Sequence, residues 1–142
     1  MDSNDKVIPI RRHVPARELL LQSFHEVHDR IDSLVWGVVD AAQRDDERCL
    51  GLCDDLRSEL SEWNDICLSC IERGLLANDD EIRHILRVPF FMVSHLELMF
   101  LYSRKNGSQA AYYRKEIQAT APEFSQLQAR IVSLLTVGGG KA

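Results

Sequence analysis

Residues 49–73 carry the feature that most limits how this chain can fold. Four cysteines stand there in two pairs, Cys49 with Cys53 and Cys67 with Cys70, a spacing close to that of zinc sites. The segment from 52 to 73 contains no glycine or proline, so nothing interrupts a helix between the pairs. In one continuous helix the two pairs lie roughly 27 Å apart, because each residue adds about 1.5 Å. A single metal ion cannot bridge that distance, and the spacing favours a long helix.

The same segment has one apolar side and one acidic side. At about 100° per residue, the cysteines fall on a stripe of apolar side chains, while Asp and Glu occupy the opposite side. The stripe consists of Cys49, Cys53, Leu56, Leu60, Trp63, Cys67 and Ile71, with Cys70 at its edge. We therefore expect a helix over residues 46–73 in which the thiols are buried as small hydrophobic groups.

Three more segments repeat apolar residues at three- and four-residue steps, which predicts three further helices. They cover residues 15–42, 78–105 and 108–137. Pro89 and Pro122 lie inside the last two segments, where a proline predicts a kink. Four long helices with short connections predict an all-α protein, an antiparallel up-down four-helix bundle with kinks near both prolines.

The two ends of the chain fall outside this pattern. Residues 1–14 are expected to form a flexible or extended arm, because Pro9 and Pro15 disfavour helix in the residue before each of them. Residues 138–142 begin with three glycines and are expected to form a disordered tail. A single helical-bundle domain over residues 15–137 is therefore predicted. Gly74 is predicted to end the cysteine-bearing helix.

Charge and composition exclude several classes of partner. The 142 residues carry a net charge of −5 and are 45% hydrophobic, which is typical of one soluble domain. This acidic balance argues against nucleic acid as the main partner. The most apolar stretch, residues 85–102, contains Arg87, Ser94, His95 and Glu97, a density of polar groups that argues against a membrane span. No signal peptide is recognised, so a cytoplasmic protein with reduced thiols is expected.

The helix predicted over residues 78–105 has a wider apolar side than a core requires. Its apolar arc between 85 and 102 covers roughly 220°, about twice the usual core-facing stripe. Either two neighbouring helices cover this arc, or part of it is exposed as a partner surface or dimer seam, where aromatic residues and Met are enriched. The residues expected to make that contact are Phe91, Met92, Leu98, Met99 and Tyr102. Residues 7–10 of the arm are a second candidate.

Histidines supply an alternative, a metal ion or small ligand held between helices. Glu81 and His84 have the Glu-x-x-His spacing of di-iron bundles, but Gln22 stands where a second glutamate would precede His25. His84 and His95 lie about 16 Å apart in a regular helix, so a site would need residues from several helices. The set considered for such a site is His28, Glu81, His84 and His95.

No sequence pattern typical of catalysis is found. The chain has no nucleophile elbow, no phosphate-binding loop and no dinucleotide fingerprint. We therefore expect a protein that is not an enzyme and needs no cofactor. Its expected role is that of an adaptor, escort chaperone or regulator that contacts a partner protein or, as a homodimer, a second copy of itself. A bundle that binds a metal ion or small ligand is the alternative.

Overall fold

The chain folds into four α-helices in a computed structural model that describes residues 16–141, with side chains described for residues 18–136. The helices are α2 (Ala16–Gln43), α3 (Arg48–Glu72), α4 (Asp80–Lys105) and α5 (Ala110–Lys141), and the short 3₁₀ turn η1 (Gly107–Gln109) leads into α5. No strand occurs within the described range. The prediction of an all-α four-helix bundle is confirmed.

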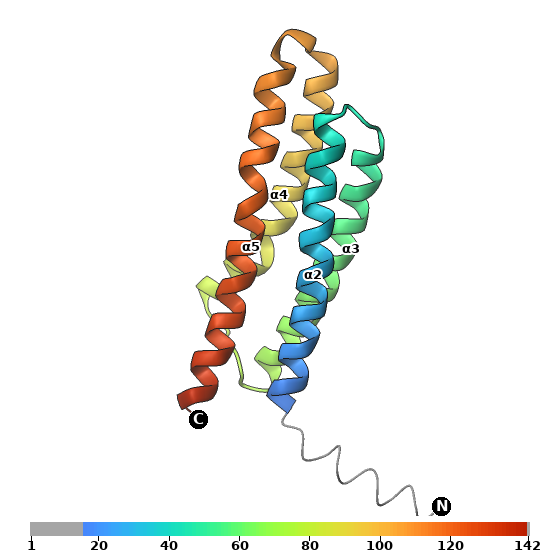
Figure 1. Ribbon diagram of the computed structural model, residues 1–142. Coiled ribbons are helices and arrows are strands. Elements are labelled where there is room, and N and C mark those ends of the chain that lie inside the picture. The colour runs from blue at the N-terminus through green and yellow to red at the C-terminus, as the bar shows by residue number, and fades with distance from the viewer. Residues whose placement is uncertain (1–15, 142) are drawn as a thin grey trace, which may run out of the picture.

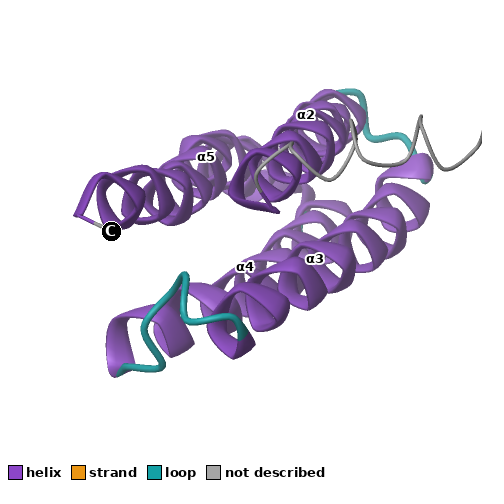
Figure 2. Ribbon diagram, turned by 90° about the horizontal axis from the view of Figure 1, so that it is seen from below, coloured by secondary structure: helices purple, strands orange, loops and turns teal. Residues whose placement is uncertain are grey.

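The helices pack side by side around a common core. α2 packs against α3 and α5, and α4 also packs against α3 and α5. In Figure 1 the chain rises along α2, descends along α3, rises again along α4 and descends along α5. The view from below shows α2 and α5 in one layer and α3 and α4 in the other (Figure 2). The connections are short, as is usual between neighbouring helices of a bundle.

The predicted apolar stripe of α3 faces the core. α3 is one helix from Arg48 to Glu72, and its four cysteines are all buried and free. The ring of Trp63 on this stripe meets Phe24 of α2 edge to face, with 4.6 Å between the ring centroids. Cys70, which the sequence places at the edge of the stripe, is fully buried, while Ile71 is partly exposed. The prediction that the thiols act as small core hydrophobes is confirmed.

Gly74 ends α3, as its position in the sequence predicts. Its φ is +74°, a conformation that costs glycine little because it has no Cβ. The N–H of Leu75 donates to the carbonyl of Cys70 at 2.8 Å, and the N–H of Gly74 donates to that of Ile71 at 3.0 Å. This pair of bonds is the Schellman motif, which reverses the chain toward α4.

The predictions for the two prolines, the tail and the arm have different outcomes. Pro89 and Pro122 lie inside continuous helices, so neither proline divides its helix, and a bend at either one stays a prediction. α5 extends to Lys141, through the three glycines expected in a disordered tail. Once a helix exists, each added residue gains a hydrogen bond without a new nucleation cost, which offsets the low helix propensity of glycine. The predicted arm, residues 1–14, lies outside the described residues.

α4 is apolar far beyond what the core uses. Within residues 16–141 it is the one helix long and apolar enough to span a membrane by length and composition alone, yet only 33% of its most apolar window is buried in the bundle. Glu97 within this helix is half-buried and forms an ion pair with Arg57 of α3 at 2.9 Å. α4 therefore packs as one member of the bundle and leaves much of its apolar surface outside.

Candidate functional site

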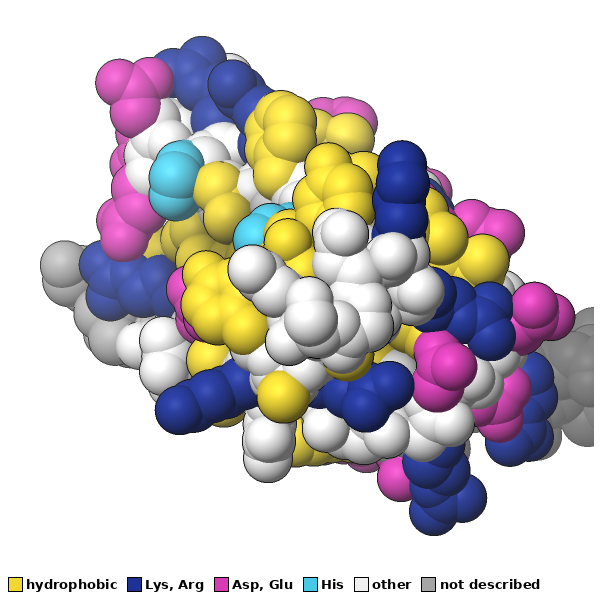
Figure 3. All heavy atoms as spheres, turned by 90° about the horizontal axis from the view of Figure 1, so that it is seen from above, with side chains coloured by type: hydrophobic (Ala, Val, Ile, Leu, Met, Phe, Trp, Pro, Cys, Tyr) yellow, Lys and Arg dark blue, Asp and Glu magenta, His cyan; other side chains and the backbone are white. Residues whose placement is uncertain are grey.

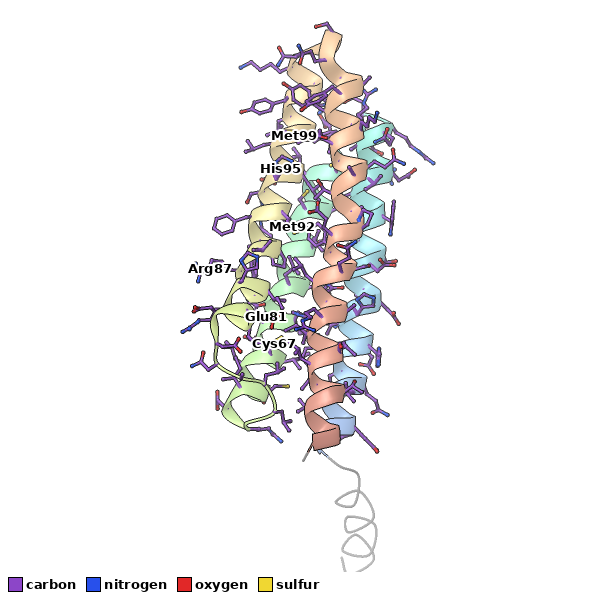
Figure 4. The ribbon with its side chains drawn as sticks, turned by 90° about the vertical axis from the view of Figure 1, so that its left-hand side faces the viewer. Cys67, Glu81, Arg87, Met92, His95 and Met99 are labelled. Atoms are coloured by element: carbon purple, nitrogen blue, oxygen red, sulfur yellow. The ribbon has the colours of Figure 1, made fainter. Side chains whose placement is uncertain are left out.

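α4 has a buried face and an exposed face on opposite sides. The buried side chains are Ile82, Ile85, Pro89, Val93, Leu96, Phe100 and Ser103. We call the opposite side the outward face of α4, and it consists of His84, Arg87, Val88, Phe91, Ser94, His95, Leu98, Leu101, Tyr102 and Lys105. All of them except Val88 are exposed. Figure 4 shows Arg87 pointing away from the bundle.

Ion pairs and a helix cap set which side of α4 faces outward. The carboxylate of Asp79 accepts a hydrogen bond from the backbone N–H of Ile82 at 3.0 Å and begins the helix. Glu81 pairs with Arg130 of α5 at 2.8 Å, and Glu97 pairs with Arg57 of α3. Because these two carboxylates contact helices on either side, they help to fix the rotation of α4 and leave most of the outward face exposed.

Three of the five predicted contact residues are exposed. Phe91 is 66% exposed, Leu98 47% and Tyr102 41%. Met92 and Met99 are partly buried instead and pack against the core, because they lie one residue further around the helix, toward the bundle (Figure 4). The second predicted contact segment, residues 7–10, lies outside the described residues.

The sequence prediction missed two exposed apolar residues near this face. Leu101 lies on the outward face, three residues after Leu98, and that spacing was the signal available in the sequence. Tyr112, at the start of α5, comes close only through tertiary packing. Its ring contacts Tyr113 at 5.4 Å between centroids, and Tyr113 lies 5.7 Å from Tyr102 of α4. Viewed toward this end of the molecule, hydrophobic side chains reach the surface beside histidines, Lys and Arg (Figure 3).

One acidic residue, Asp80, is exposed at the N-terminal end of the outward face of α4, where it pairs with Arg83 of the same helix at 2.8 Å. The other two carboxylates of α4, Glu81 and Glu97, pair with arginines of neighbouring helices. Arg87 and Lys105 have no ion-pair partner among residues 18–136. The face is therefore an apolar stripe with positive charge near both ends.

The four thiols are poorly suited to nucleophilic chemistry. A hydrogen bond with Cys49 and burial both raise the pKa of Cys53, and the same bond lowers the pKa of Cys49. Burial raises the pKa of Cys67, and it also raises that of Cys70, where Arg73 opposes part of the effect. Each thiol is also closed to solvent, whereas a reactive cysteine needs an accessible thiolate.

The four residues of the alternative metal set are not brought together. His28 of α2 hydrogen-bonds to Gln128 of α5, and Glu81 is paired with Arg130. His84 and His95 are exposed on the outward face of α4, on the side away from α2. No group of three or more His, Cys, Asp or Glu side chains able to hold a metal ion occurs in the part of the chain that the structure describes. The side chains are separated because each helix has a particular rotation about its own axis in the bundle. The sequence alone did not define that rotation.

A groove of about 480 Å³ lies between α2 and α5. Its walls are formed by His25, His28, Ser125, Gln128, Ala129, Val132 and Ser133. Gln128 is only 2% exposed; its Oε1 accepts a hydrogen bond from His28 Nδ1, and its amide nitrogen has no partner among the described residues. A buried amide donor without a partner is uncommon in folded proteins. The groove has the size of a small-molecule site and combines apolar walls with a few polar groups.

Comparisons with protein-family models, curated proteins and solved structures find no match for this chain.

Proposed function

We propose that this protein works without catalysis, as a cytoplasmic adaptor, escort chaperone or regulator that binds a protein through the outward face of α4. The partner is another protein or a second copy of this chain. The observation that carries the proposal is the concentration of exposed apolar side chains on one helix. Of the eight large hydrophobic side chains exposed among the described residues, four lie on this face: Phe91, Leu98, Leu101 and Tyr102.

Exposed apolar surface of this kind supports a binding role. Single exposed hydrophobic residues are common on soluble proteins, but a continuous patch is typical of an interaction site. Aromatic residues, which are enriched at interfaces, occupy both ends of the stripe, Phe91 at one and Tyr102 with Tyr112 at the other. The buried thiols and the separated histidines leave no comparable arrangement for chemistry in the described residues.

Replacing Leu98 by glutamate is expected to remove partner binding while leaving the fold intact. Leu98 is 47% exposed, so the change in the free energy of unfolding should stay within about 0.5 kcal/mol. A charge at the centre of an apolar contact should lower affinity by at least about tenfold. The measurements are light scattering over a concentration series and comparative capture of proteins from an extract of the native host.

Leu68→Glu is the matched control, because Leu68 is 49% exposed but belongs to α3 rather than to α4. Wild type and Leu68→Glu should share a dimer or a captured protein that Leu98→Glu lacks. A strict monomer whose captured proteins are the same for wild type and both variants would contradict the proposal.

Binding of a small ligand in the groove between α2 and α5 is a second candidate, favoured by the unpaired amide of Gln128. The ligand would be a small, largely apolar molecule with an oxygen acceptor. Native mass spectrometry and elemental analysis of freshly purified protein should then detect a bound molecule that is lost in Gln128→Leu. The matched control Gln126→Leu changes an exposed residue of α5 and should keep it. If native mass spectrometry of wild type shows only the mass of the polypeptide, with no bound molecule, this candidate is contradicted.

A further inference from the structure

We infer that the partner bound by the outward face of α4 is an amphipathic helix of another protein, with an apolar stripe flanked by Asp and Glu. This inference rests on the proposed function and adds the chemistry of the partner. It follows from two independent properties of the face, the spacing of its central residues and the sign of its charge.

The central residues of the face have the spacing of a coiled-coil seam. Val88, Phe91, His95, Leu98 and Tyr102 follow one another at alternating steps of three and four residues. This average of about 3.5 residues is the repeat that keeps a stripe aligned with a second helix. From Val88 to Tyr102 the seam is about 21 Å long, two heptads at about 1.5 Å per residue. Met92 and Met99, half-buried beside the seam, form one edge of it (Figure 4).

The unpaired charged residues around the seam are cations, and they favour a partner with negative charge. Arg87 lies beside one end and Lys105 beyond the other. Glu81 and Glu97 pair with arginines of neighbouring helices, and Asp80, exposed at the N-terminal end of the face, pairs with Arg83. A partner helix with Asp or Glu beside its apolar stripe would place acids next to Arg87 and Lys105.

A second copy of the same face fits less well. In a parallel pair Arg87 would meet Arg87 and Lys105 would meet Lys105, and in an antiparallel pair each would approach the other. In both cases these unpaired cations face cations, and the one exposed acid at the end of the face, Asp80, is already paired with Arg83, so the contact is destabilised. An anionic membrane offers the right charge, but polar Ser94 interrupts the apolar surface beside the centre of the seam. A narrow seam flanked by charges matches a helix better than a lipid surface.

Three labelled peptides test the inference on the full-length protein. Each is about 21 residues long, or three heptads, with Leu at the seam positions. One carries Glu at the flanking positions, one carries Lys there, and one is a scramble of the Glu peptide that keeps its composition. Fluorescence anisotropy should show that the Glu peptide binds at least about tenfold more tightly than the Lys peptide and the scramble, with an affinity that falls as salt rises.

Charge reversal on the protein should reverse this preference. The double variant Arg87→Glu, Lys105→Glu should bind the Lys peptide more tightly than the Glu peptide, and Leu98→Glu should bind neither. Circular dichroism checks that each variant is folded. The inference is overturned if wild type binds the Glu and Lys peptides equally or binds no peptide. It is also overturned if vesicles containing phosphatidylserine, but no peptide, bind in a way that requires Leu98.

The outcomes separate this inference from the proposed function. A dimer or a captured protein that depends on Leu98, together with failure of the Glu peptide, would leave the proposed function standing and reject the acidic helix. If the Glu peptide does not bind and no dimer or captured protein depends on Leu98, both the inference and the proposed function are rejected.

Discussion

Trp63→Ala is expected to lower the free energy of unfolding by about 3–5 kcal/mol, the usual loss when a large aromatic side chain is removed from a core. Trp63 is 2% exposed and packs edge to face against Phe24 at the interface of α2 and α3. Removing it leaves a cavity and also ends the aromatic contact, worth about 0.5–1.5 kcal/mol beyond the buried area. Urea unfolding followed by circular dichroism measures the loss.

The chain provides its own control for this experiment. Trp36 on α2 is 46% exposed, so Trp36→Ala should change the free energy of unfolding by no more than about 0.5 kcal/mol. The double variant Phe24→Ala, Trp63→Ala should lose less than the sum of the two single variants, because the second change no longer breaks the ring contact. Equal losses for Trp63→Ala and Trp36→Ala would contradict the arrangement of this core.

Raising the pH from about 7.5 to about 10 is expected to remove about 2 kcal/mol of stability for each of Cys53 and Cys67, and Cys70 is expected to contribute in the same direction. The folded pKa of each of these thiols is raised, for Cys67 and Cys70 chiefly by burial. Below an unfolded pKa of about 8.5, both folded and unfolded chains keep these protons. Above it, the unfolded chain releases protons that the folded chain retains, so stability falls as pH rises. Cys49, whose pKa is lowered, acts in the opposite sense.

Unfolding in urea at several pH values, with a reductant present, checks this expectation. The smaller core side chains of the double variant Cys67→Ala, Cys70→Ala should lower its free energy of unfolding by an amount that does not depend on pH. Its loss of stability between about pH 7.5 and about pH 10 should nevertheless be smaller than that of wild type, by about 2 kcal/mol from Cys67 and a further amount of the same sign from Cys70. All other titratable groups are common to both proteins, so their contribution cancels in the comparison. The same pH dependence in both proteins would show that the thiols are not buried as described.

Exposure of the outward face of α4 could be anticipated only in part. The apolar arc over residues 85–102 indicated that this helix carried more apolar surface than one core contact requires, and Phe91 and Leu98 were predicted to be exposed. Met92 and Met99 were placed in the same set, but they pack against the core. An arc on a helical wheel does not show which of its edges the neighbouring helices cover, because that depends on the rotation of the helix in the bundle.

The pairing of Glu81 and Glu97 with neighbouring helices also depends on tertiary contacts. Glu81, Glu97 and the cations are visible in the sequence, but their pairing is not. Arg130 lies 49 residues from Glu81 and Arg57 lies 40 residues from Glu97, so each pair forms only when two helices meet. The alternative metal set failed for the same reason, since His28 and His84 belong to helices whose relative rotation no local pattern determines.

The sequence by itself determined that four helices form within residues 16–141, where α3 begins and ends to within about two residues, and that its thiols face inward. These properties depend on the spacing of neighbouring residues, on Gly74 and on the absence of breakers between 52 and 73, all of which act over one or two turns. Only the tertiary structure decided which side of α4 remains exposed, that Tyr112 extends its surface, and that a groove lies beside Gln128. These follow from how helices far apart in the chain pack together.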